Sequence, residues 1–247
     1  MPKDSIRRER LYEQVTKAIA LRILDGTLRV DSDASTEAEL CADLGVSRTV
    51  LREAVKVLNA KGLVEIRPKT GMRVRPRSQW NLIDRELMMW QAELGVSKEF
   101  LRDLYQVRLM LEPATAAAAA THATEEELNG IRELIQRMER EVDDFNAWVE
   151  DDCEFHERIS NATHNDFLIQ INRIMLDALR GSQSLFRTQR AESKLALTLH
   201  KQVAEAILRR DAESAKSAMS FLIHLAEQNT MLVLKETGGG GDRRKQG

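Results

Sequence analysis

The sequence predicts a mainly α-helical protein with two domains, and three observations lead to this prediction. Aromatic residues make up only 4% of the 247 residues while 43% are hydrophobic, a balance that favours helices over a large sheet. The first 76 residues alternate short helical patterns with turn signals and end in a hairpin pattern. Beyond them apolar residues recur at helical spacing, and no proline follows Pro113.

The N-terminal part begins with two predicted helices. The first carries apolar residues at helical spacing and ends near Gly26: Leu11, Val15, Ile19 and Ile23. Thr36 and Glu39 form a T-x-x-E capping box, which predicts that a second, short helix begins at ELCADL.

A third helix and a hairpin complete this domain. Gly45 breaks the second helix, Ser47 is the expected N-cap of RTVLREAVKVLNAK, and Gly62 closes that helix. The segments LVEIR and MRVRP then read as two strands around the turn PKTG. Helix, helix, tight turn, helix and hairpin is the order of a winged helix-turn-helix, so residues 1–76 are predicted to bind DNA.

The residues expected to contact DNA lie in the first turns of the third helix and at the hairpin tip: Ser47, Arg48, Thr49, Arg52, Lys69, Thr70 and Gly71. Arginine can fork onto guanine or phosphate, and hydroxyls can hold phosphate. Residues 1–80 carry 16 Lys and Arg against 11 Asp and Glu, a charge of +5, whereas the remainder carries −7. This asymmetry suits a polyanion partner, although Arg48 and Arg52 alone would also suit the solvated face of an amphipathic helix.

The rest of the chain reads as a connector, a helical domain and a tail. The connector, residues 77–96, is rich in Trp and Leu and is therefore expected to pack on both domains. Residues 97–236 form the predicted all-helical domain, and the tail 237–247, which contains the low-complexity stretch GGGGDRRKQG, is expected to be disordered. The helices are expected near 98–121, 124–143, 145–162, 165–189, 193–209 and 212–235.

Four residues of the helical domain form a candidate metal site. Asp152 and His156 are four residues apart and so share one helix face, while His200 and His224 lie on two later helices. One carboxylate and three imidazoles suit Zn²⁺, with Ni²⁺ or Mn²⁺ as alternatives. The alternative interpretation of this spacing is that the three histidines are ordinary core residues of their helices.

The N-terminal block ELCADLGVSRTVLREAVKVLNAKGLV, followed by Gly71 and Val74, resembles the signature of the GntR family of bacterial regulators over residues 10–76. The resemblance implies a dimer that binds a short DNA palindrome, with the hairpin tip at the minor groove. Two departures, Val30-Asp31 in place of a Pro-Gly pair and Ala38 in place of an arginine, argue against assuming the operator sequence of the family.

Residues 98–232 resemble the helical effector domain of the FadR branch, called FCD. The motif of Asp152 and His156, the later His200 and His224, and RLMLEPATAAAAA carry this resemblance. It implies that the four residues bind a metal inside an FCD-type bundle. Arg108 then becomes a candidate clamp for an effector carboxylate, with a salt bridge to Glu112 as its alternative role.

The connector QWNLIDRELMMW is similar to that of galactonate-operon repressors, which makes a sugar acid such as an aldonate the preferred effector. The predicted function is thus a homodimeric repressor of a sugar-acid operon, released from operator DNA by a small carboxylate. Two alternatives are a DNA-binding dimer whose helical half is purely structural and a metal-dependent hydrolase, against which the lack of an H-E-x-x-H motif argues. Without an apolar signal core, a 20-residue apolar span or spaced cysteines, a cytoplasmic protein with no membrane partner is expected.

Overall fold

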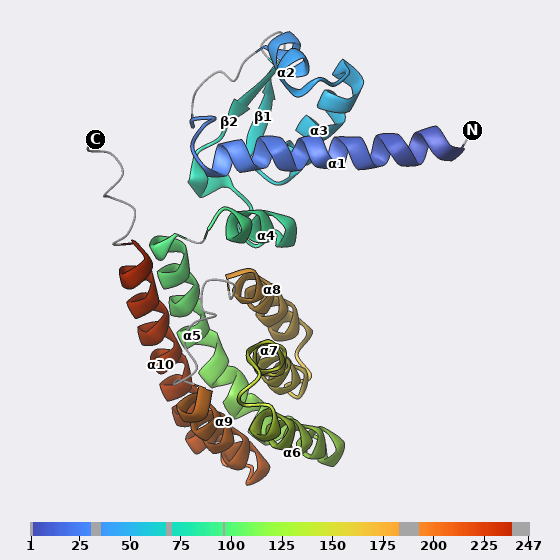
Figure 1. Ribbon diagram of the computed structural model, residues 1–247. Coiled ribbons are helices and arrows are strands. Elements are labelled where there is room, and N and C mark those ends of the chain that lie inside the picture. Colours follow the sequence, from blue (N-terminus) through green and yellow to red (C-terminus); the bar gives the residue numbers. More distant parts are fainter. Residues whose placement is uncertain (1, 31–35, 68–70, 96, 183–192, 239–247) are drawn as a thin grey trace. The chain divides into compact units, whose positions relative to one another are not determined.

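The computed structural model of the chain describes residues 2–30, 36–67, 71–95, 97–182 and 193–238. These residues form two compact units, Met1–Gly95 and Val96–Gly247 (Figure 1). Within the described ranges, no helix combines the length and the apolar character that crossing a membrane requires.

The part of the first unit that precedes the connector contains three helices and one hairpin among its described residues. The elements are α1 (Pro2–Leu24), α2 (Glu37–Leu44), α3 (Arg48–Ala60), β1 (Val64–Arg67) and β2 (Gly71–Val74). Helices α1 and α2 pack against α3, and the two strands pair antiparallel with Val64 opposite Val74. The predicted winged helix-turn-helix is therefore confirmed.

Local interactions explain the tight turn between α2 and α3. The Thr36 hydroxyl accepts a hydrogen bond from the Glu39 N–H while the Glu39 carboxylate accepts one from the Thr36 N–H, as the capping box predicts. Gly45 ends α2 with a φ of +65°, a conformation that glycine adopts without strain. Ser47 then caps α3 by accepting a hydrogen bond from the Val50 N–H.

The connector is a packed part of the first unit. Trp80, Leu87 and Trp90 join the core that α1, α3 and the hairpin build around Leu51 and Leu58. The connector also forms a short 3-10 helix, Arg77–Gln79, and the helix α4, Arg85–Glu93. Since the division between the units follows Gly95, residues 77–95 belong with the DNA-binding fold.

A buried lysine fastens the end of α3 to α4. Lys61 is only 7% exposed, and its ammonium lies 2.8 Å from Asp84 Oδ1 and 2.6 Å from Glu86 Oε2. Burial alone would lower the pKa of Lys61, but the two carboxylates outweigh it and raise the pKa above its usual value. The neighbouring Gly62 has a φ of +76°, and a Cβ there would lie 2.4 Å from the backbone oxygen of Gln79.

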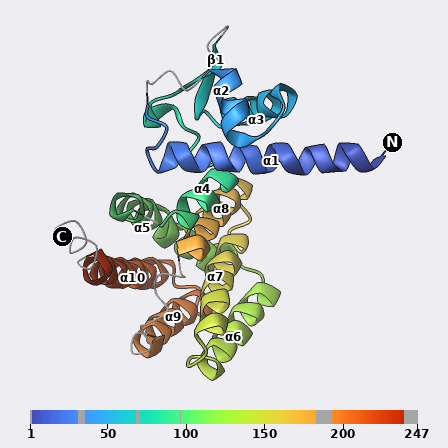
Figure 2. The same ribbon diagram turned by 45° about the horizontal axis from the view of Figure 1, so that its top comes forward.

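The second unit consists of helices alone in its described parts. They are α5 (Lys98–His122), α6 (Glu125–Arg140), α7 (Phe145–Asn161), α8 (Asp166–Ser182), α9 (Ser193–Leu208) and α10 (Ala212–Gly238). Helix α10 packs along α5, α7 lies between α6 and α8, and α9 contacts α5, α6 and α10 (Figure 2). The expected end of the fourth of these helices at residue 189 and most of the expected tail, 239–247, fall outside the described residues.

Helix α5 is the central element of the second unit and contains Pro113. Proline has no N–H, so the carbonyl of Leu109 one turn earlier lacks its usual helical partner. The polar residues Arg108, Glu112 and Thr115 flank this break and are all buried. The interrupted turn of α5 therefore faces the interior in which the candidate site lies.

Candidate functional site

The DNA-reading candidates lie at the start of α3. Arg48 and Thr49 are exposed in its first turn, which contains no acidic residue. A cation at a helix N-terminus is locally unfavourable, because the helix dipole places positive charge there. The same end of a helix attracts phosphate. Arg48 therefore favours the binding of a polyanion at a small cost in helix stability.

Arg52 is already engaged on the protein surface. Its Nε donates to Glu37 Oε1 at 2.7 Å, and its side chain remains 67% exposed. DNA binding through Arg52 would have to replace this partner. The Ser47 side chain serves as the helix cap, Gly71 opens β2, and Lys69 and Thr70 lie outside the described residues.

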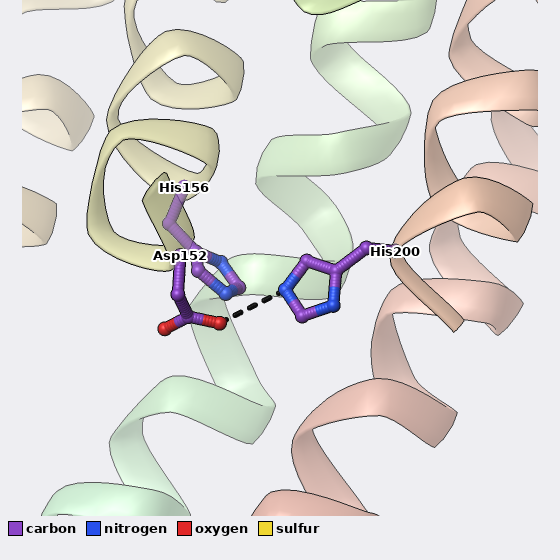
Figure 3. A group of neighbouring side chains, drawn as sticks. All are labelled: Asp152, His156 and His200. Carbon is purple, nitrogen blue, oxygen red and sulfur yellow. Dashed lines mark ion pairs between the residues drawn. The ribbon is translucent and has the colours of Figure 1, made fainter. Parts of the chain in front are cut away.

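In the second unit three of the four candidate metal ligands come together (Figure 3). Asp152 and His156 on α7 and His200 on α9 each offer one ligand atom, and these atoms lie within 4.8 Å of one another. His156 is 6% exposed and His200 is 1% exposed, whereas Asp152 is partly buried. Two imidazoles and one carboxylate form a donor set typical of Zn²⁺ and related divalent ions.

The surroundings of the His200 ring indicate which nitrogen is available to a metal. Nδ1 lies 2.7 Å from the Ala196 carbonyl oxygen, to which only a protonated nitrogen can donate. When the ring is neutral, the Nε2 lone pair therefore faces Asp152 Oδ1 at 2.9 Å, and this nitrogen is then buried without a hydrogen-bond partner. Two opposed acceptors need a proton or a cation between them, so the residues fit a metal ion.

The carboxylate of Asp152 is held in its charged form. Burial alone would raise the pKa of Asp152. When His200 is protonated, its hydrogen bond to Asp152 and the charges of His156, His200 and Arg108 outweigh burial and hold the pKa well below its usual range. The adjacent Cys153 behaves in the opposite way, since burial raises the pKa of its thiol to about 12. Asp152 is thus ready to bind a cation at neutral pH, whereas Cys153 remains a protonated thiol.

Arg108 and Glu112 form a buried ion pair beside this cluster. Arg108 Nε lies 2.5 Å from Glu112 Oε1, and each residue is 4% exposed. Glu112 Oε2 lies 2.7 Å from His156 Nδ1, but the two atoms are not oriented as in a hydrogen bond. Burial raises the pKa of Glu112, but Arg108 and His156 outweigh this effect and lower the pKa to about 2. Of the two roles predicted for Arg108, the structure therefore contains the salt bridge to Glu112.

His224 does not lie with the other three candidate ligands. It is exposed on α10, and its Nδ1 contacts the carbonyl oxygen of Ser220, one turn earlier on the same helix. The buried face of α10 instead carries Met219, Leu222 and Ile223. Positions 222 and 224 are about 200° apart around a helix, so a shift of two residues moves a side chain to the opposite face.

Sequence reasoning missed Asn172, which lies on α8 next to the cluster. It is 4% exposed and borders a small cavity together with Glu112 and His156. Leu168 and Leu176 lie four residues before and after it, so an asparagine interrupts an otherwise apolar helix face. This interruption was the signal available in the sequence.

Comparisons with known proteins agree with both halves of this description. The family described as "Bacterial regulatory proteins, gntR family" matches residues 11–74, and the FCD domain matches residues 103–225. "Uncharacterized HTH-type transcriptional regulator YieP" of Escherichia coli is 32% identical over 211 residues, which cover 85% of this chain and 90% of that protein. The "Galactonate operon transcriptional repressor" of Escherichia coli is 29% identical over 213 residues, 85% of this chain and 93% of that one.

Solved structures support the fold. The Listeria monocytogenes protein Lar, described as controlling expression of the agr system, matches with a TM-score of 0.60 at 18% identity, covering 90% of this chain and 95% of that chain. Because its relatives are regulators of transcription, the hydrolase alternative finds no support. The chain belongs to the GntR family of bacterial transcription regulators, with a GntR-type DNA-binding domain followed by an FCD domain.

Proposed function

We propose that this regulator is a homodimeric repressor of a sugar-acid catabolic operon, released from its operator by a small carboxylate bound in the FCD domain. The observation that carries the proposal is the buried group of Asp152, His156 and His200, with the Arg108–Glu112 pair beside it. Uncompensated polar groups are costly in a protein interior, and such a group is typical of a binding site. Relatives named for galactonate and Uxu operons favour an aldonate or a similar acid.

In this proposal, Asp152, His156 and His200 hold a divalent ion, with Zn²⁺ preferred and Ni²⁺ or Mn²⁺ as alternatives. A three-ligand site leaves coordination positions open, which a carboxylate and a neighbouring hydroxyl of an acid can fill. Arg108 supplies the positive charge that complements the acid, while the Ala196 carbonyl orients the His200 ring.

Metal binding can be tested without an effector. We expect His200→Ala to weaken Zn²⁺ binding by at least about 10–100-fold, the range reported even for loss of supporting groups around a metal. Saturating Zn²⁺ at about 100 times its dissociation constant should stabilise the wild type by about 2.7 kcal/mol and this variant much less. Isothermal titration and thermal unfolding of the chelator-treated protein measure both effects.

His224→Ala is the matched control, because His224 is exposed on α10 and lies apart from the cluster. It should bind Zn²⁺ like the wild type. A loss equal to that of His200→Ala would make His224 a fourth ligand and contradict the arrangement described here. Absence of Zn²⁺, Ni²⁺ and Mn²⁺ binding by the wild type would leave these histidines as core residues.

DNA binding can be tested with an operator selected from a random duplex library by the full chain. Arg48→Ala is expected to weaken binding roughly tenfold, because a fork onto guanine or a phosphate contact is lost. If Arg48 reads a base, the variant should also relax specificity at one position; if it holds a phosphate, the salt dependence should decrease instead.

Lys56→Ala is the control for Arg48, since Lys56 is also an exposed cation of α3 but lies two turns further from its N-terminus. Its effect should be clearly smaller. Equal effects of the two substitutions would mean that α3 contributes only diffuse positive charge. Wild-type affinity of both variants would show that α3 does not lie in the major groove.

A further inference from the structure

The cavity beside the cluster has an unusual polar lining. It measures about 10 Å³, which is room for one water-sized group. Its polar wall is formed by Glu112, Thr115, His156 and Asn172, and its apolar wall by Ile159, Leu176 and Met219. The cavity therefore adjoins the candidate metal site through His156 and the buried ion pair through Glu112.

The hydrogen bonds around Asn172 fix the orientation of its amide. The Thr115 hydroxyl donates its only proton to the Leu111 carbonyl at 2.9 Å, so its oxygen can only accept from Asn172. The amide atom that faces Thr115 Oγ1 at 3.4 Å must be the nitrogen, Nδ2. The same nitrogen donates to Ser160 Oγ at 3.0 Å, which occupies its second proton.

The opposite atom of the amide, Asn172 Oδ1, is buried and has no hydrogen-bond partner. Buried acceptors of this kind are rare in folded proteins, because they lose their hydrogen bonds to water and gain nothing in return. The second acceptor-bearing residue of the lining is Glu112, whose carboxylate oxygens face the guanidinium of Arg108, the nearer at 2.5 Å. A group that enters the cavity must therefore bring protons for hydrogen bonding.

We infer that Asn172 is a specificity-determining residue of the effector site and that its Oδ1 accepts a hydrogen bond from a hydroxyl of the bound acid. This inference rests on the proposed function and names the part of the ligand that this wall recognises. A hydroxyl fits both the size and the acceptor lining of the cavity. A second carboxylate or a ketone at the same place brings only acceptors and is rejected.

The test compares D-galactonate with the five analogues that each lack one of its hydroxyls, from 2-deoxy to 6-deoxy, in titrations of the Zn²⁺-treated full chain. The wild type should bind D-galactonate at least about tenfold more tightly than one of the analogues, since that analogue leaves Oδ1 unpaired. Asn172→Leu, which has a similar shape and no acceptor, should bind the two acids equally. Asn172→Ala provides the same comparison if the leucine variant does not fold.

Two outcomes overturn the inference and leave the proposed function standing. One is a wild type that binds D-galactonate and all five deoxy analogues equally, which means that no hydroxyl is recognised. The other is a preference that survives in Asn172→Leu and Asn172→Ala, which means that another residue reads the hydroxyl and the cavity holds only water. A wild type that binds none of these acids would overturn the inference and this choice of effector together.

Discussion

Glu112→Ala is expected to lower the free energy of unfolding by about 3–5 kcal/mol, the usual effect of breaking a buried ion pair by removing one partner. Arg108 would be left 4% exposed without its carboxylate, with the Tyr105 ring 5.2 Å from its guanidinium as a weak substitute. Burial alone would lower the pKa of Arg108, yet Glu112 and other nearby groups raise it, so Arg108 remains charged. Urea unfolding of the metal-free full chain measures the effect.

The double variant Arg108→Met with Glu112→Leu is the control for this experiment. Replacing both members of a buried ion pair by apolar residues of similar volume is often neutral or stabilising. It should therefore recover most of the stability lost in Glu112→Ala. A single variant that unfolds within about 1 kcal/mol of the wild type would mean that water reaches Arg108, as at an exposed ion pair.

The second large effect is expected on the coupling between acid and DNA. In the wild type, saturating sugar acid should weaken operator binding by about 5–150-fold, the usual range of a coupling free energy. The double variant should bind the operator as tightly as the wild type and ignore the acid, because it lacks the Arg108 charge. The single variant Arg108→Ala is less suitable, since it leaves Glu112 buried with only His156 nearby.

The measurement is operator affinity with and without D-galactonate, for the wild type and the double variant. Thermodynamic reciprocity supplies an internal check, because operator DNA must weaken acid binding by the same factor. If DNA affinity of the wild type stays the same with every acid that binds it, the helical half serves dimerisation alone. Release of the double variant by the acid would remove Arg108 from the effector site.

The order of elements was predictable because local sequence signals determine it. The capping box of Thr36 and Glu39, the Ser47 cap and the turn at Gly45 each act within a few residues, and the structure contains all three. The pair of Asp152 and His156 was predictable for the same reason, since a spacing of four places both on one face of α7.

Features that depend on packing between helices were harder to predict. Whether His224 joins the cluster depends on which face α10 turns toward α5, and a shift of two residues reverses the answer. The contact of Glu112 with His156 joins α5 to α7 across 44 positions of the sequence. The free acceptor of Asn172 follows only from the bonds made by Thr115 and Ser160, which no pattern in the sequence specifies.

Pro113 gives α5 a point at which the helix can bend, and such a bend moves the start of the helix. Fifteen residues separate Lys98, where α5 begins, from Pro113, a distance of about 22 Å at 1.5 Å per residue. A helix missing one backbone hydrogen bond bends more easily at that point, and Arg108, Glu112 and Thr115 lie within one turn or so of it. A bend of about 10° there would displace the start of α5 by roughly 4 Å, three residues from the Gly95 end of the first unit. A ligand that bent α5 by this amount would move its start by about three quarters of the pitch of a helix, which is about 5.4 Å.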